Sequence, residues 1–167
     1  MPALAQITAA NALEFKAIRL IALQDSPTAF GSTYAKESQF SDGDWIKRAA
    51  DWSSDRSIGY LAMDSVTACG IAAAFLSEGD PRIAYLISMW VAPSHRRSGI
   101  GRKLVDAIDA WAKSRNVHVL KLMVTSNNQT AIEFYKQNGF LMTGNTEPYP
   151  NDPTLIEYEM SRSVTPA

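Results

Sequence analysis

The stretch that decides the fold is VAPSHRRSGIGRKL, residues 91–104, where an apolar strand pattern ends in a turn of arginines and glycines and a helical pattern begins. Gly99 and Gly101 allow the backbone to come close to a ligand. The first amides of a helix have no partner inside it, and the helix dipole adds positive potential at that end. The stretch therefore predicts a phosphate-binding turn between a strand and a helix.

The charge of this turn indicates which phosphate ligand it binds. Its four cationic side chains are Arg96, Arg97, Arg102 and Lys103. Several charge-assisted contacts suit a diphosphate better than a single phosphate. The glycine spacing of residues 99–104, GIGRKL, matches neither the P-loop pattern nor the dinucleotide-binding pattern, so both of those nucleotide folds are excluded.

On both sides of the turn, the chain alternates strand and helix patterns. Strand patterns cover residues 4–8, 58–63, 68–76, 83–91, 117–124, 140–146 and 155–160, and helix patterns cover 11–25, 41–50, 100–115 and 128–138. The central strand, helix, strand unit implies a parallel crossover, whereas the flanking hairpins imply antiparallel pairing. The prediction is an α/β fold with a central mixed, mostly antiparallel sheet flanked by about four helices.

Local signals predict how these helices begin and pack. We expect Asn11 to cap the first helix and Gly139 to follow the last one. The apolar face of the first helix is expected to consist of Leu13, Ala17, Leu20 and Ile21. Residues 30–40 show no regular pattern, so we expect an irregular segment there.

Composition limits the class of protein. With 167 residues, of which 46% are hydrophobic and 20% charged, the chain is expected to form one globular domain over residues 1–167. Its formal net charge of −1 lacks the positive field that nucleic-acid binding needs. Cys69 and two histidines cannot supply four zinc ligands without carboxylates, so we expect no metal. Since no apolar stretch spans a bilayer and no secretory leader is evident, we expect no membrane partner and a cytoplasmic location by default.

Three segments carry a resemblance to one known family. The spacing R-x-x-G-x-G of residues 96–101, preceded by VAP at 91–93, resembles the acetyl-coenzyme A motif of the GNAT superfamily of N-acetyltransferases. Residues 128–140, NQTAIEFYKQNGF, are similar to the later family motif of an Asn, an Ala, a Tyr and a closing Gly-Phe. Residues 19–31 resemble the N-terminal helix and loop of many small bacterial members. The resemblance covers nearly the whole chain and implies direct acetyl transfer from acetyl-CoA to a primary amine in a ternary complex.

The resemblance also implies roles for individual residues. The pyrophosphate of acetyl-CoA is expected at Arg96, Arg97, Ser98, Gly99, Ile100, Gly101 and Arg102. The backbone of Met89, Trp90 and Val91 is expected to pair with the pantetheine arm and to polarise the thioester, and Asn128 is expected to hydrogen-bond that arm. Tyr135 is the expected proton donor to the departing thiolate, since a phenol with a pKa near 10 can donate.

The general base and the acceptor site are less well defined by the sequence. Residues 83–91 contain no carboxylate, and their only polar side chains are Tyr85 and Ser88. A water held by Ser88, or a carboxylate such as Glu37, could deprotonate the amine, and activity is expected to rise toward alkaline pH. The residues expected to meet the acceptor are Phe30, Tyr34, Glu37 and Tyr85.

Three interpretations of the function stay open at this stage. A small-molecule amine is the favoured acceptor, and a protein N-terminus or a lysine side chain is the alternative. A non-catalytic acyl-CoA sensor would keep the arginine turn but would not need Tyr135. An exposed edge strand, such as the one expected at residues 155–160, could pair with its copy across a two-fold axis. This is the basis for a homodimer as a further hypothesis.

Overall fold

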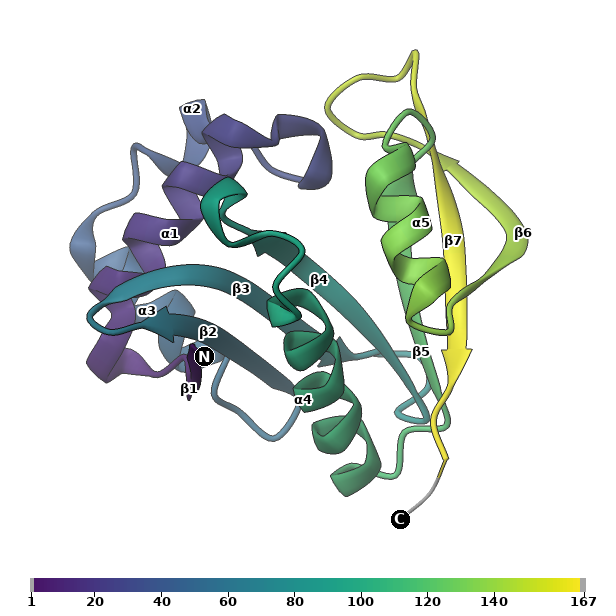
Figure 1. Cartoon of the computed structure of the whole chain (residues 1–167), viewed down its shortest axis with the longest axis horizontal. Coiled ribbons are helices and arrows are strands. Elements are labelled where there is room, and N and C mark those ends of the chain that lie inside the picture. The colour runs from purple at the N-terminus through teal and green to yellow at the C-terminus, as the bar shows by residue number, and fades with distance from the viewer. Residues whose placement is uncertain (1, 166–167) are drawn as a thin grey trace.

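The computed structural model describes residues 2–165 and shows a seven-stranded sheet with helices on both faces (Figure 1). The strands are β1 (Ala3–Gln6), β2 (Ser57–Asp64), β3 (Thr67–Leu76), β4 (Ile83–Val91), β5 (Val119–Thr125), β6 (Leu141–Pro148) and β7 (Ile156–Ser163). The α-helices are α1 (Ala12–Asp25), α2 (Tyr34–Glu37), α3 (Asp42–Asp51), α4 (Ile100–Ser114) and α5 (Gln129–Gln137). Short 3₁₀ helices are η1 (Ala9–Asn11), η2 (Pro27–Ala29) and η3 (Pro93–His95). Every predicted strand and helix is present, in the predicted order.

The sheet is mixed, as predicted. Its strand order is β1-β2-β3-β4-β5-β7-β6, and β4 and β5 form its parallel pair. Helix α4 makes the crossover between them, because parallel neighbours cannot be joined by a tight turn. One prediction is wrong: the strand expected at residues 155–160 corresponds to β7, which is not an edge strand but pairs with both β5 and β6. Met160 of β7 is fully buried while every residue of β6 is exposed, so the hairpin places its more apolar strand inside.

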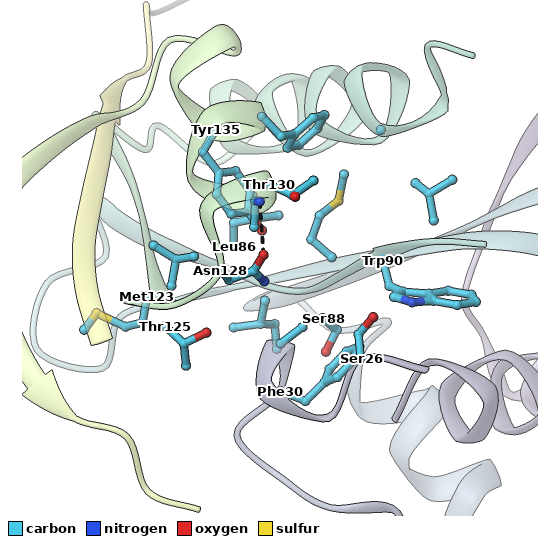
Figure 2. A pocket seen from close by; sticks show the side chains of 18 of the residues that line it. Ser26, Phe30, Leu86, Ser88, Trp90, Met123, Thr125, Asn128, Thr130 and Tyr135 are labelled. Carbon is cyan, nitrogen blue, oxygen red and sulfur yellow. Dashed lines mark hydrogen bonds between the residues drawn. The ribbon is translucent and has the colours of Figure 1, made fainter. Parts of the chain in front are cut away.

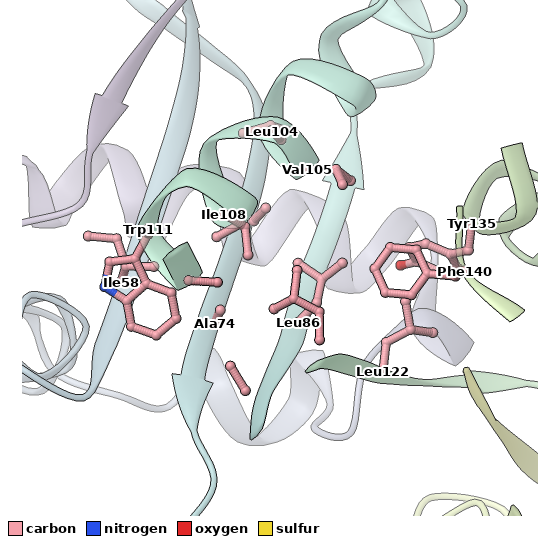
Figure 3. Packing of buried hydrophobic residues seen from close by; sticks show 14 of the residues in the cluster. Ile58, Ala74, Leu86, Leu104, Val105, Ile108, Trp111, Leu122, Tyr135 and Phe140 are labelled. Carbon is pink, nitrogen blue, oxygen red and sulfur yellow. The ribbon is translucent and has the colours of Figure 1, made fainter. Parts of the chain in front are cut away.

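The sheet separates two hydrophobic cores. On one face, α4 and α5 pack against the strands. Leu104 and Ile108 of α4 belong to the same core as Leu86 of β4, and Trp111 lies beside Ile58 (Figure 3). On the other face, α1 and α3 form the second core. Its largest members are Phe15, Ile18, Leu23, Trp45, Leu61 and Ile71. The central strands are therefore buried on both sides, as expected for a sheet covered by helices on each face.

Helix α1 differs from its prediction in its cap and in its buried face. The side chain of Asn11 does not cap α1 but bonds to backbone groups at the end of β1 and just after it. The buried residues of α1 are Ala12, Phe15, Ile18, Arg19, Ala22 and Leu23. Leu13 and Ile21 are instead exposed, by 57% and 56%. The prediction followed apolar residues alone, whereas the true buried stripe includes an arginine, Arg19.

The remaining local predictions mostly hold. Ser41 and Asp44 form a capping box at the start of α3, and Gly139 follows α5 with φ of +88°. The segment predicted to be irregular contains one helical turn, α2, which Thr33 caps. Within residues 2–165, no helix is long and apolar enough to cross a membrane.

Candidate active site

The cleft of the molecule opens where β4 and β5 part. The two strands are paired only at residues 83–85 and 119–121. Beyond this point they diverge toward their carboxyl ends (Figure 1). A cleft of about 1290 Å³ follows the divergence, lined on one side by α4 and α5 and on the other by η2 and the segment that joins β6 to β7. The sheet thus supplies a binding site at the carboxyl ends of its parallel pair.

A bulge in β4 presents backbone groups to this cleft. The β3–β4 register skips between Ile71 and Ala73, so that Ser88 and Met89 together face one residue of β3. Ser88 has φ of +57°, in the left-handed region that favours glycine. Because the extra residue of a bulge is left out of the ladder, peptide groups here are available to a ligand. Ser88, Met89, Trp90 and Val91 all line the cleft.

The turn before α4 has the geometry of an anion site. Gly99 caps α4 with φ of +86°, and Arg97 precedes it with φ of +60°. The first amide of α4 with a carbonyl partner is that of Lys103, which donates to Gly99 O at 3.0 Å. Among the residues that the structure describes, the amides of residues 97–102 have no such partner. They are therefore free to bind an anion at the positive end of the helix.

Two of the four turn cations are available to such an anion. Arg97 and Arg102 line the cleft, and neither has an ion-pair partner in the described part of the chain. Lys103 does not line the cleft, because its Nζ donates to the carbonyl of Pro2 at 2.8 Å. The prediction that all four cations surround the ligand is therefore wrong for Lys103.

Arg96 lines the cleft but is held by the protein. Its Nη2 lies 2.9 Å from Asp25 Oδ2, and its Nε donates to the carbonyl of Val91 at 2.8 Å. The same Asp25 oxygen accepts from Ser26 Oγ at 2.7 Å and from Trp90 Nε1 at 3.0 Å. These donors, Ser26 first, hold the pKa of Asp25 below its usual range. Arg96 thus fastens the end of α1 to the end of β4.

The other turn residues contribute through their backbone. Ser98 Oγ donates to the carbonyl of His95, and the side chain of Ile100 is 1% exposed in the core. Gly101 lines the cleft, and a Cβ there would lie 2.8 Å from the ring of Phe134. The glycine at 101 is therefore required by the close packing of α4 on α5, in addition to any approach of a ligand.

Tyr135 reaches the cleft from α5, and Asn128 reaches it from the residue that caps this helix (Figure 2). The Tyr135 ring is 9% exposed and packs edge-on against Phe134 and Phe140. Burial raises the pKa of Tyr135 well above its ordinary value of 10.0, so the phenol stays protonated and can donate. The Oδ1 of Asn128 caps α5 by accepting from Ala131 N at 3.2 Å, which leaves its amide nitrogen for a ligand.

The four predicted acceptor residues do not all meet in the cleft. Phe30 and Tyr85 line it, and the ring of Tyr85 stacks on Phe75 with centroids 5.5 Å apart. Tyr34 and Glu37 do not line it. Tyr34 lies on α2 and is 39% exposed, whereas Glu37 is 1% exposed. The expected acceptor wall is therefore formed by only two of these residues.

Glu37 is an anion buried between two arginines. Arg19 donates to it through Nε at 3.0 Å and Nη2 at 2.9 Å, and Arg48 donates at 2.9 Å. Burial alone would raise the pKa of Glu37, but the hydrogen bonds and charge of Arg19 outweigh it and lower the pKa from 4.5 to about 2. So acidic a carboxyl group, placed outside the cleft, does not suit the predicted role of general base.

Three further cleft residues carry chemistry that the sequence did not indicate: Arg19, Thr125 and Glu157. Thr125 and Glu157 are directly paired across β5 and β7, so their side chains share one face of the sheet. Burial, and Glu147 opposite, raise the pKa of Glu157. No motif marks these positions, because they reach the cleft only through strand pairing and helix packing.

Residues 19–140 match the family model described as the acetyltransferase (GNAT) family. The chain belongs to the GNAT family. The matched range spans most of the chain and contains the arginine turn, Asn128 and Tyr135, so the resemblance found in the sequence is confirmed.

Curated relatives of this GNAT chain match part of it. Streptothricin acetyltransferase of Streptomyces lavendulae is 37% identical over 75 residues, which cover 45% of this chain and 39% of that protein. The catalytic subunit naa20 of the N-terminal acetyltransferase B complex of Schizosaccharomyces pombe is 30% identical over 69 residues, which cover 41% of this chain and 38% of that protein. The matches thus span less than two fifths of either relative.

The GNAT fold extends over the whole chain. The structure of yncA from Salmonella typhimurium, solved with its cofactor acetyl-CoA, superposes with a TM-score of 0.79 at 16% identity. The superposition covers 100% of this chain and 96% of that one. At this identity the likeness concerns the fold, and it confirms the predicted acyl-CoA N-acyltransferase architecture.

Proposed function

We propose that this GNAT protein transfers the acetyl group of acetyl-CoA to the primary amine of a small molecule. One observation carries the proposal: a single cleft joins the amide-lined arginine turn to a buried, protonated tyrosine. The first feature suits the pyrophosphate of the cosubstrate, and the second suits a thiolate that must be protonated as it leaves.

The described residues fit acetyl-CoA along the length of the cleft. Its pyrophosphate would be held by the amides of residues 97–102 together with Arg97 and Arg102. Its pantetheine arm would lie between β4 and β5, where the bulge at Met89 offers peptide groups and Asn128 offers an amide nitrogen. A binding site for so long a ligand needs polar groups at specific points along an otherwise apolar lining, and the cleft contains both.

The proposed reaction is direct attack by the amine. The nitrogen attacks the thioester carbonyl carbon, the C–N bond forms, and the C–S bond breaks with its electron pair on sulfur. Tyr135 donates its phenolic proton to the sulfur and regains one from water, while the extra proton on nitrogen passes to solvent. Holding both reactants in one cleft supplies much of the rate enhancement by proximity.

A covalent route through cysteine is not supported by the structure. Cys69 is 1% exposed, lies outside the cleft, and its Sγ donates to the carbonyl of Ala62 at 3.4 Å. Burial also raises the pKa of the Cys69 thiol, which keeps it protonated and a poor nucleophile. This supports transfer in a ternary complex.

A small acceptor is favoured by how the acceptor end of the cleft is closed. Tyr149 Oη donates to the carbonyl of Phe30 at 2.6 Å, and Asn151 Nδ2 donates to the carbonyl of Ser32 at 3.2 Å. These bonds tie the β6–β7 segment to the loop after η2. The likeness to streptothricin acetyltransferase points in the same direction, whereas the likeness to naa20 makes a protein N-terminus the second candidate. A cytoplasmic location and a homodimer stay predictions.

The experiment that tests this function has two stages. Titration calorimetry with acetyl-CoA measures binding, and thiol release is then followed with amines, amino acids, aminoglycosides and N-terminal peptides. We expect binding, and release with one class of small amine. Release with peptides alone would establish the second candidate, and binding without release would favour a sensor. Absence of binding would overturn the proposal.

A further inference from the structure

A buried arginine borders the acceptor side of the cleft. Arg19 is 5% exposed and lines the cleft from α1. Its guanidinium is fixed by the two hydrogen bonds to Glu37 and lies 4.7 Å from the centre of the Phe30 ring. A charged group is rarely buried in this way unless its position is strongly determined by its partners.

The remaining contact of Arg19 is made with the bulge of β4. Its Nη1 donates to Ser88 Oγ at 2.8 Å. A guanidinium has only donors, so the Ser88 oxygen must accept this bond, and the hydroxyl hydrogen must point elsewhere. Within residues 2–165 the hydroxyl donates to no other group, and Ser88 lines the cleft. The geometry thus makes Ser88 a hydrogen-bond donor toward the cleft.

The charge of the surrounding cluster strengthens this donor. Arg19 and Arg48 share the single carboxylate of Glu37, which leaves one positive charge uncompensated. A hydroxyl that accepts a bond from a cation is polarised, which makes it a better donor and a poorer proton acceptor. The cluster therefore favours negative charge on a ligand atom beside Ser88.

We propose that Ser88 donates a hydrogen bond to the acetyl carbonyl oxygen of acetyl-CoA, and that Arg19 is the positioning residue that aims its hydroxyl. The inference rests on the proposed acetyl transfer. As the amine nitrogen bonds to the carbonyl carbon, the C=O electron pair moves onto oxygen, and the Ser88 hydroxyl stabilises that charge. When the C–S bond breaks, the pair returns to reform C=O. Ser88 itself keeps its proton throughout, and this role differs from holding a water that deprotonates the amine, which the sequence suggested for it.

The first test combines two substitutions in a double-mutant cycle. We expect Ser88→Ala to lower kcat about 100-fold, the effect of removing one such donor, with little change in KM for acetyl-CoA. Arg19→Lys is expected to lower kcat in the wild type but to change it less than about twofold in the Ser88→Ala background. Equal losses in both backgrounds would overturn the positioning role of Arg19.

A matched control separates this role from simple support of the fold. Arg48→Lys keeps the charge of the cluster and disturbs the hydrogen bond to Glu37, but it removes no bond to Ser88. We expect it to lower the melting temperature while leaving kcat unchanged. If Arg48→Lys and Arg19→Lys lower kcat alike, the cluster is only structural and the proposal fails.

The second test does not depend on turnover, and it remains available if the Arg19 variant does not fold. The carbonyl stretch of carbonyl-¹³C acetyl-CoA bound to the protein is measured by isotope-edited infrared spectroscopy. We expect a lower frequency with the wild type than with Ser88→Ala, because a hydrogen bond weakens the C=O bond. Equal frequencies would overturn the inference. Failure of the proposed function would look different: the wild type would not bind acetyl-CoA or would release no thiol with any amine.

Discussion

The two walls of the cleft are built in different ways. On the cofactor side, the groups that matter are consecutive: the amides of residues 97–102 and two arginines among them. On the acceptor side, Arg19 meets Glu37 across 18 residues and Ser88 across 69 residues. The first wall depends on one strand, turn and helix, and the second depends on the whole fold. Substitutions should therefore act locally in the first wall and at a distance in the second.

The largest effect is expected in the turn itself. Arg97→Ala combined with Arg102→Ala should weaken acetyl-CoA binding roughly 150-fold, from two charge-assisted contacts of about 1.5 kcal/mol each. Lys103→Ala is the matched control, because Lys103 binds the carbonyl of Pro2 outside the cleft. Calorimetry should show that the Lys103→Ala variant binds acetyl-CoA with nearly wild-type affinity. Equal losses in both proteins would mean that general charge, and not the geometry of the turn, attracts the ligand.

The next effect tests Tyr135, the proposed proton donor to the departing thiolate. Tyr135→Phe should lower kcat roughly 100-fold with little change in acetyl-CoA affinity, as expected for loss of a proton donor. Since burial raises the pKa of Tyr135, the wild-type rate should show no fall due to this phenol as pH rises toward 10. A steady-state pH profile checks this, and unchanged turnover in the variant would remove Tyr135 from the mechanism.

A smaller effect is expected where the cofactor wall depends on packing. Gly101→Ala places a Cβ 2.8 Å from the Phe134 ring and should destabilise the fold by about 2 kcal/mol through overpacking. Urea denaturation measures this loss. Adding Phe134→Leu should recover part of it by making room. No recovery would mean that the loss of stability does not come from the contact with Phe134.

The last effect concerns Glu37 behind the acceptor wall and is a dependence of stability on pH. The pKa of Glu37 is lowered from 4.5 to about 2 in the fold, so its contribution to stability is present above pH 4.5 and is lost as pH falls toward 2. Glu37→Gln should be less stable at neutral pH but should lose less stability than the wild type across that acid window. Denaturation of both proteins at several pH values measures the free energy of unfolding of each as a function of pH. Asp42→Asn is the control, because the Asp42 side chain is 66% exposed in its ion pair with Lys16. It should have little effect on stability at any of these pH values.

The sequence predicted what depends on neighbouring residues. The arginine turn and the glycine after α5 each involve a few consecutive positions, and both are found as expected, whereas the cap expected at Asn11 is not formed. The sequence could not show that Arg96 is held by Asp25, because 71 residues separate them. It also could not show that Arg19 is buried, since its ion partner becomes visible only when α2 packs beside α1.

The strand order could not be predicted for the same reason, because it depends on contacts between distant segments. The alternation of β7 predicts a strand but not its neighbours, so its inner position beside β5 required the structure. The same holds for Glu157, which enters the cleft only because β7 pairs with β5 at Thr125. Local chemistry was therefore predictable, and the acceptor site, which depends on contacts between distant segments, was not.

The back-to-back arrangement of the two cores has a consequence for how the molecule opens. Adjacent residues on one strand, such as Leu61 and Ala62 of β2, belong to different cores. Asp25 further joins α1 to β4 through Trp90 and Arg96. Unfolding of either core would separate the shared strands and expose apolar side chains of the other core to water. The two cores therefore form one cooperative unit. Backbone amides of β2 to β4 are expected to exchange with heavy water through a single shared opening event, with one common free energy.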